Sequence, residues 1–286
     1  VSQLKHLGLS SGDTVFVAAD LLRVGYFNKN AEQTLTDWVD IFDQILGEEG
    51  TIVVPTYSPT FIRLLKKYDF VFTKDTQSVS GSLARAYLEF APGSLRGSHP
   101  TNSCTSKGKY SELISEADGP QYSKYHPYSK VIELGGKNLM LGIVDERNCP
   151  FTYHYIQEKL KQTTSHPYCG LLETTFLNEQ GEKEKYIVKE IGGCTAGVHK
   201  TWGYHLSSNA VTFGQVGRSL SALVDAKKSC EILENIMTKY PKFIKCDDKK
   251  CISCYGRFRY NGFGVIFFYL KALPVLFHKL YKRLAA

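Results

Sequence analysis

Residues 11–20 read SGDTVFVAAD, and this stretch decides the fold. The apolar run Thr14–Ala18 follows the turn signal SGD, and a short apolar run of this kind predicts a strand buried on both faces. Leu35–Leu46 then places apolar residues at helical spacing with acids between them, which predicts an amphipathic helix. Thr51–Val54 gives a second apolar run. This order predicts a right-handed βαβ unit and therefore an α/β fold.

Later segments add strands and helices to this unit. Asn138–Val144 is a third apolar run, which we expect in the same sheet. Glu173–Leu177 and Lys185–Lys189 flank Asn178–Gly181, and this arrangement predicts an exposed hairpin. Ser219–Tyr240 has apolar residues at helical spacing, which predicts one amphipathic helix. The expected architecture is a mixed central sheet flanked by helices.

The composition limits the class of protein. The chain has 286 residues, of which 43% are hydrophobic and 22% are charged, so it can bury a substantial core. These values exclude a disordered chain, a collagen and a disulfide-dense mini-protein. Eight cysteines are a modest number for this length, and the first 30 residues contain no long apolar block. We therefore expect reduced thiols, no signal peptide and a cytoplasmic setting.

The net charge of +7 is unevenly distributed. Residues 241–286 carry ten Lys or Arg against two Asp, so the preceding residues are nearly neutral. This contrast predicts two parts. Residues 1–240 would form the domain that performs the chemistry. Residues 241–286 would form a basic, aromatic C-terminal extension of helical or irregular structure.

Polar side chains follow the three predicted parallel strands, at the sheet edge where ligands gather in open α/β folds. His154 and Gln157 lie after the third strand, three residues apart, and share one face if a helix begins there. A histidine beside a carboxylate such as Asp145 makes a general base with a fixed tautomer. A core histidine within an aromatic cluster is the alternative.

Two short polar loops, Asp75–Gly81 and Arg96–Ser103, form a second candidate region. Hydroxyls, a glycine and an arginine in such loops can hold phosphates through backbone N–H groups and a guanidinium. Neither a Walker loop nor a dinucleotide fingerprint is present. Ordinary serine-rich surface loops are the alternative.

Taken in order, these segments resemble the aminoglycoside 3-N-acetyltransferase (antibiotic N-acetyltransferase) family over roughly residues 5–240. The blocks that carry the resemblance are Gly12–Val17, Gly50–Ser58, Ser78–Ala84, Pro92–Ser103, Leu139–Gly142 and the segment around His154. The resemblance implies an antibiotic N-acetyltransferase-like mixed α/β fold. It also implies transfer of acetyl from acetyl-CoA, as co-substrate, to a sugar amine.

The resemblance further implies roles for single residues. His154 would be the general base, with Asp145 as its candidate carboxylate, and Gln157, Glu158 and Tyr57 would face the acceptor. The residues expected on the CoA side are Asp20, Leu21, Thr56, Ser58, Ser78, Ser80, Gly81, Arg96, Ser98, His99 and Ser103. An amine is mostly protonated at neutral pH and must lose a proton before it attacks the thioester, and an imidazole suits that task.

Two departures from the family pattern bear on the acceptor. The usual His-Ser-Ser-Leu after the first strand reads Ala18-Ala19-Asp20-Leu21, and the usual His-x-x-Glu reads His154-Tyr155-Ile156-Gln157. A lost carboxylate favours a less cationic acceptor. We therefore expect the amine of an amino sugar on a nucleotide or lipid diphosphate carrier, as in surface-polysaccharide synthesis. An aminoglycoside acceptor and a catalytically silent member that binds CoA or a sugar are the alternatives.

The tail contains a cluster of thiols. Cys246, Cys251 and Cys254 lie within nine residues of one another in sequence. A structural zinc ion is one interpretation, and its fourth ligand would come from elsewhere; the candidates are Cys230, His199 and His205. Free thiols are a second interpretation, and an iron–sulfur cluster or a disulfide is a third.

Residues 263–283 combine a mostly apolar run, which is shorter than a membrane span requires, with basic residues after it. Packing on the body or on a second copy in a homo-oligomer is one interpretation. Peripheral contact with an anionic membrane is the other. No recognised nucleic-acid module is present, so we expect no nucleic-acid partner.

Overall fold

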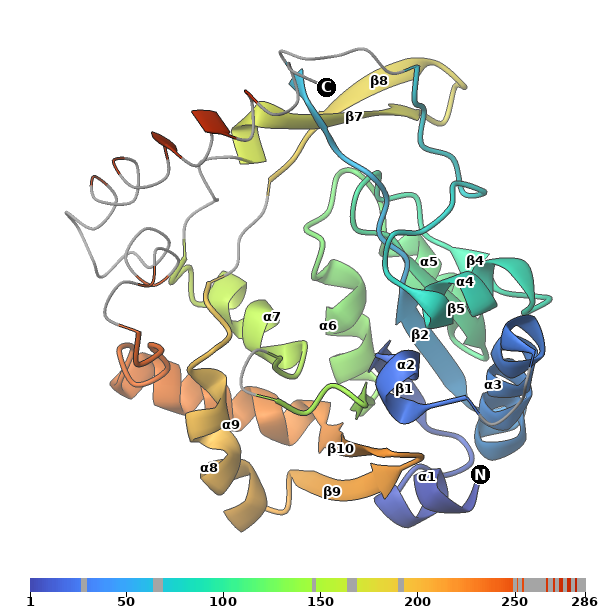
Figure 1. The fold of residues 1–286 in the computed structure, drawn as a ribbon, viewed down its shortest axis with the longest axis vertical. Coiled ribbons are helices and arrows are strands. Elements are labelled where there is room, and N and C mark those ends of the chain that lie inside the picture. Colours follow the sequence, from blue (N-terminus) through green and yellow to red (C-terminus); the bar gives the residue numbers. More distant parts are fainter. Residues whose placement is uncertain are drawn as a thin grey trace.

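The computed structural model describes residues 1–26, 30–63, 69–145, 148–163, 169–189 and 193–248, with Cys251, Cys254 and seven isolated positions after residue 260. Its centre is a seven-stranded sheet in the order β4-β5-β2-β1-β6-β10-β9 (Figure 1). The strands are β1 Thr14–Ala19, β2 Thr51–Pro55, β4 Leu95–Arg96, β5 Cys104–Gly108, β6 Lys137–Leu141, β9 Val211–Val216 and β10 Ser219–Asp225. β1 pairs in parallel with β2 and β6, and the other pairs are antiparallel. The predicted mixed α/β sheet is confirmed.

Alternate side chains of β1 enter two different cores, because successive residues of a strand point to opposite faces. Val15 and Val17 pack with α1 (Ser2–Leu7), α2 (Leu21–Val24), α3 (Ala31–Leu46) and α4 (Ser82–Glu89). Phe16 packs with α5 (Ser111–Glu116), α6 (His126–Glu133) and α9 (Ala226–Lys239). Helices therefore cover both faces of the sheet. This two-sided burial explains why the β1 sequence is apolar throughout rather than alternating.

A second, three-stranded sheet lies apart from the first, beyond the carboxyl ends of β1 and β2 (Figure 1). It consists of β3 (Phe61–Ile62), β7 (Leu172–Leu177) and β8 (Lys183–Ile187). β7 and β8 pair antiparallel across a turn at Asn178–Gly181, so the predicted hairpin is confirmed.

The prediction of one helix over Ser219–Tyr240 is wrong for its first seven residues. They form β10, which lies between β6 and β9, and only the remainder forms α9. Leu223 enters one core, whereas Ala222 and Val224 enter another, so the apolar residues follow the period of a strand that is covered on both faces. Asp225 separates the two elements by accepting a hydrogen bond from Lys228 N at 2.9 Å as the N-cap of α9.

The chain after α9 returns to the body. Ile244 is completely buried in a cluster with Tyr153, Leu233 and Met237. Most of residues 263–283, and with them most of the predicted apolar run, lie outside the described residues. The five apolar or aromatic positions described there are exposed: Ile266, Leu270, Leu273, Phe277 and Tyr281. Within the described part of the chain, every helix is too short or too polar to cross a membrane.

Arg96, at the end of β4, joins three loops at the edge of the sheet. The residue is only 5% exposed, and burial lowers the pKa of its guanidinium to about 10, so it remains a cation at neutral pH. The guanidinium donates to Ser103 Oγ at 3.0 Å, Thr56 O at 2.6 Å, Ser58 Oγ at 3.1 Å, Lys74 O at 3.1 Å and Thr76 O. A buried cation whose donors are used in this way fixes the loops relative to one another.

Replacing Arg96 by Met should lower the free energy of unfolding by about 3 kcal/mol or more, because several buried acceptors lose their donor at once. Urea denaturation measures the change. Arg85→Met is the matched control, since that exposed arginine pairs only with the surface carboxylates of Glu89 and Glu32 in the described structure. Similar small losses in both variants would refute the structural role of Arg96.

Candidate active site

Helix α7 (Thr152–Lys159) carries His154 and is anchored to the central sheet at its first turn. Thr152 Oγ1 lies 2.9 Å from Asn138 Nδ2 on β6 and 2.7 Å from Tyr128 Oη on α6. Tyr153 and Ile156 are completely buried. In Figure 1, α7 lies beside α6 and α9. The neighbours of His154 are thus fixed in the core, while the imidazole itself is only half-buried.

The imidazole of His154 is oriented by Gln157, as the three-residue spacing predicted. His154 Nδ1 lies 3.0 Å from Gln157 Oε1, and the same oxygen accepts a hydrogen bond from Gly193 N at 2.8 Å. Because a backbone N–H can only donate, the amide oxygen, not the amide nitrogen, must face this position. An oxygen can only accept from Nδ1–H. The tautomer that fits therefore has its proton on Nδ1 and its lone pair on Nε2.

The other end of the Gln157 amide has a different environment. Gln157 is completely buried, and its Nε2 has no hydrogen-bond partner among the described residues. A buried N–H group without a partner costs free energy. The amide therefore has one buried N–H group that no described residue satisfies.

Residues that precede α6 connect His154 with the loop of His99, and they are contributors that the sequence reasoning missed. Tyr125 stacks on His154 with ring centroids 5.8 Å apart, and Lys124 Nζ lies 4.9 Å from the centre of the Tyr125 ring. Ser123 Oγ donates to Glu158 Oε2 at 2.8 Å. The run of aromatic residues in this segment, YSKYHPY at 122–128, is the signal that could have identified it.

His99 is a structural histidine in this arrangement. It is 1% exposed, and its Nδ1 accepts from Thr101 N at 3.3 Å and Asn102 N at 3.0 Å. Its Nε2 lies 3.2 Å from Tyr186 Oη. Burial, assisted by the charge of Lys124, lowers the pKa of His99 to about 4, so the ring is neutral at physiological pH. Its backbone contacts place the proton on Nε2, the opposite tautomer to that of His154.

Asp145 and Asp20 both contact Arg23. Asp145 Oδ2 accepts from Arg23 Nη1 at 2.8 Å, and its Oδ1 accepts from the backbone and side chain of Asn148. Asp20 is the N-cap of α2 and accepts from Arg23 N at 3.1 Å. Leu21 is buried in the core. Asp20 therefore caps a helix and Leu21 packs in the core.

The loop that follows β2 is linked to the loop before α4. Ser80 Oγ accepts from Tyr57 N at 2.8 Å, and Ser78 Oγ donates to Tyr57 O at 3.0 Å. Gly81 begins α4 with a φ of 94°, in the left-handed region that favours glycine. Thr56, Ser58 and Ser103 lie beneath these loops and are buried around Arg96.

Two neighbouring cavities open along these loops, and Lys74 lines both. One, of about 650 Å³, is lined by Ser78, Gly81 and Arg85 among others, at the N-terminus of α4. The other, of about 570 Å³, is lined by Ser98, which is exposed, and by residues of the β7–β8 hairpin. The exposed members of the predicted CoA side therefore border open cavities, whereas the buried members form the scaffold behind them.

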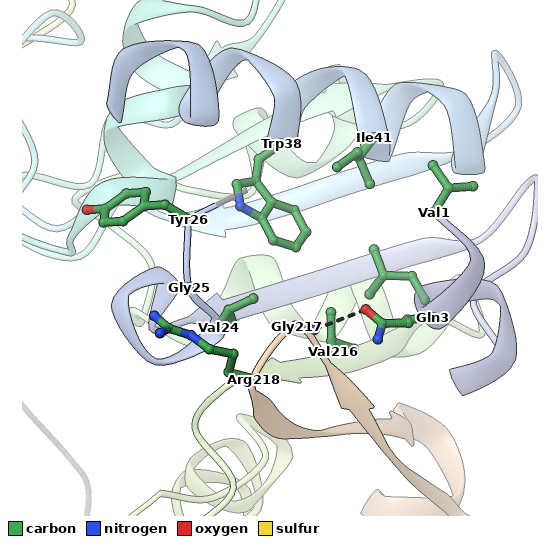
Figure 2. A pocket seen from close by; sticks show the side chains of 11 residues that line it. Val1, Gln3, Val24, Gly25, Tyr26, Trp38, Ile41, Val216, Gly217 and Arg218 are labelled. Carbon is green, nitrogen blue, oxygen red and sulfur yellow. Dashed lines mark hydrogen bonds between the residues drawn. The ribbon is translucent and has the colours of Figure 1, made fainter. Parts of the chain in front are cut away.

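Figure 2 shows a further cavity of about 490 Å³, between α3 and the turn that joins β9 to β10. Trp38 and Ile41 project into it from α3, and Val24 and Tyr26 approach from the segment after β1. Gln3 accepts from Gly217 N at 3.0 Å at its rim. None of the residues predicted for the site is among those that line this cavity.

The three tail cysteines lie together, as predicted, and a fourth cysteine joins them. The sulfur atoms of Cys194, Cys246, Cys251 and Cys254 all lie within 4.8 Å of one another. The expectation that Cys230, His199 or His205 would complete the set is wrong. His205 is buried between Thr201 O and Ser229 Oγ, and His199 Nδ1 contacts Ala196 O. Cys194 follows no spacing pattern with the tail, so the sequence did not single it out.

Two comparisons of sequence point to one family. The family model described as aminoglycoside 3-N-acetyltransferase matches residues 16–238. The chain is also 27% identical over 154 residues to aminoglycoside N(3)-acetyltransferase III of Acinetobacter baumannii. That match covers 49% of this chain and spans about half, 52%, of the relative.

Solved structures share the fold at low sequence identity. The apoenzyme of aminoglycoside acetyltransferase AAC(3)-IVa is 18% identical and superposes with a TM-score of 0.68 over 88% of this chain and 92% of its own. The complex of AAC-IIIb with CoASH is 22% identical, with a TM-score of 0.64 over 83% and 94% of the two chains. YokD from Bacillus subtilis is 19% identical, with a TM-score of 0.66 over 84% and 92%. With a family model matched over most of its length, this chain belongs to the aminoglycoside 3-N-acetyltransferase family.

Proposed function

We propose that this chain transfers acetyl from acetyl-CoA to an amine of an amino sugar, with His154 as the general base. One observation carries the proposal: Gln157 Oε1, fixed by Gly193 N–H, faces His154 Nδ1 and so leaves the lone pair on Nε2. Family membership and the CoASH complex of AAC-IIIb support acetyl-CoA as the co-substrate. On this proposal Gln157 orients the base through its contact with Nδ1.

The reaction needs the acceptor amine as a neutral nucleophile. Nε2 of His154 would accept the proton as the amine nitrogen bonds to the thioester carbonyl carbon, and the CoA thiol leaves. Nδ1–H would keep its hydrogen bond to Gln157 throughout, which holds the ring in place while it becomes a cation. The half-buried position of His154 suits this role, because an acceptor must reach the ring from solvent.

The cavity at the N-terminus of α4 is the proposed position of the CoA phosphates. Lys74 and Arg85 lie on its lining together with Asp75 and Glu89, and the N-terminus of a helix favours anions. Thr56, Ser58, Ser103 and Arg96 would contribute by holding the loops rather than by touching CoA, since they are buried and bonded to one another.

An aminoglycoside is the acceptor that the family and its relatives support best. A second acceptor class is favoured by one observation only. Gln157 places a neutral amide, rather than a carboxylate, beside His154, which suits a less cationic acceptor. An amino sugar on a nucleotide or lipid diphosphate carrier would meet that description. Contact of residues 263–283 with a membrane and formation of a homo-oligomer stay predictions.

Release of the CoA thiol on addition of acceptor tests the proposed reaction. We expect turnover with at least one aminoglycoside, and His154→Ala should lower kcat by about 10²–10⁴-fold while acetyl-CoA binding stays unchanged. His6→Ala is the matched control, because His6 lies exposed on α1. Turnover only with carrier-linked amino sugars would favour the second acceptor class. Binding of acetyl-CoA without turnover on any amine, or normal turnover by His154→Ala, would contradict the proposal.

Gln157→Glu tests the account of the acceptor side. A carboxylate keeps an oxygen for Nδ1–H and adds a negative charge, which raises the pKa of a neighbouring imidazole and attracts cationic acceptors. The acidic limb of the kcat/KM profile should therefore move to higher pH by about one unit, and KM for aminoglycosides should fall. Gln215→Glu is the matched control, because it adds the same negative charge on the exposed surface of β9 rather than beside His154. The same shift in both variants, or in neither, would show that Gln157 does not act on His154.

A further inference from the structure

Four cysteine sulfurs converge beside α7. Cys246, Cys251 and Cys254 come from the segment after α9, and Cys194 comes from the loop before the short helix Val198–Thr201. All four sulfur atoms lie within 4.8 Å of one another, with Cys246 and Cys254 at 3.4 Å and Cys194 and Cys251 at 3.7 Å. None of the seven cysteines that the structure describes forms a disulfide. Sulfur atoms of a disulfide would lie about 2.05 Å apart, so the four sulfur atoms of this group are close together without being bonded to one another.

The spacing of the four sulfurs fits a single tetrahedral ion. Zn–S bonds of about 2.3 Å in a tetrahedron place neighbouring sulfurs about 3.8 Å apart. Four thiolates in this geometry form a closed coordination sphere, which is typical of a structural zinc site rather than a catalytic one. We propose that Cys194, Cys246, Cys251 and Cys254 bind one zinc ion and that this ion joins the C-terminal segment to the body.

The surroundings of the cysteines are built for close contact between the two segments. A Cβ atom at Gly197 would lie 2.0 Å from Ile244 O, so only glycine permits this approach. Lys200 Nζ donates to Lys245 O at 2.8 Å and to Asp247 Oδ1 at 2.5 Å, which ties the two segments together. Cys254 is completely buried and Cys246 nearly so, and both belong to the cluster that contains Ile244 and Met237. The metal would thus sit at the border of an apolar core.

The same loop fixes the residues on both sides of His154. Tyr153 Oη donates to Cys194 O at 2.9 Å, and Gly193 N donates to Gln157 Oε1 at 2.8 Å. Cys194 is therefore a zinc ligand and a neighbour of the amide that orients Gln157. On the proposed function, zinc acts as a positioning group for His154 through Cys194, Gly193 and Gln157, and it takes no part in the reaction itself.

Metal content measured by elemental analysis, on protein purified without a metal-affinity tag, tests the site directly. We expect one zinc ion per chain. Cys194→Ser should reduce the bound zinc by about tenfold or more, since a structural zinc site depends on all four of its ligands. Cys230→Ser is the matched control, because Cys230 lies in the same hydrophobic cluster but outside the sulfur group. Four alkylatable thiols without metal, iron in place of zinc, or zinc retained by Cys194→Ser would overturn the proposal.

Two further measurements keep the test decisive if a variant fails to fold. Replacing the bound metal of the wild-type chain by Co²⁺ should give the thiolate-to-metal absorption of a tetrahedral sulfur site. Removing the metal with a chelator should speed amide hydrogen exchange in residues 193–198 and 244–248 by about tenfold or more, with Thr14–Ala19 unchanged. Unchanged exchange at Gly193 would refute the positioning role. These readouts do not depend on turnover, so failure of the proposed acetyl transfer would leave them intact.

Discussion

The candidate site depends on one atom, the side-chain amide oxygen Oε1 of Gln157. It accepts one hydrogen bond from Gly193 N and faces His154 Nδ1, so one buried atom assigns the amide orientation and the imidazole tautomer together. Gln157 can hold this position because Tyr153 and Ile156, on the same helix, are buried in the core. A glutamate at this position would provide the same oxygen with a negative charge. The amide instead keeps this position neutral, which is the physical basis for asking how cationic the acceptor is.

Two buried groups, the guanidinium of Arg96 and the cluster of four cysteines, contact the loops around the candidate site. Arg96 holds the loops that end β2 and precede α4, and so shapes the cavity near Lys74 without exposing its own charge. Cys194, one of the four clustered cysteines, adjoins Gly193, which donates to Gln157 Oε1. In both places a buried charge or a buried group of thiols holds loops in position. Loops held in this way can place a reactive group with the accuracy that catalysis requires.

The sequence predicted the sheet better than it predicted the site. Buried strands such as Thr14–Ala19 are apolar throughout because helices cover both faces, and that pattern is local. The same two-sided burial misled the interpretation of Ser219–Asp225, since apolar residues on both faces of β10 mimic helical spacing. Contacts that span long stretches of chain have no local pattern. Neither Gly193 against Gln157 nor Cys194 against the tail cysteines has a signal in the spacing of residues, whereas the three-residue spacing did place His154 and Gln157 on one face.

The tautomer of His154 is the most direct test of the account. Nitrogen-15 NMR of histidine-labelled protein at about pH 8, where an imidazole of ordinary pKa is neutral, distinguishes a protonated Nδ1 from a protonated Nε2. The signal of His154 is assigned by its loss in His154→Ala, and His99 provides an internal reference for the Nε2–H form. The account predicts that His154 carries its proton on Nδ1 and that its Nε2 is unprotonated. A proton on Nε2 would contradict it, because Gln157 Oε1 would then face a lone pair and His154 could not serve as the base.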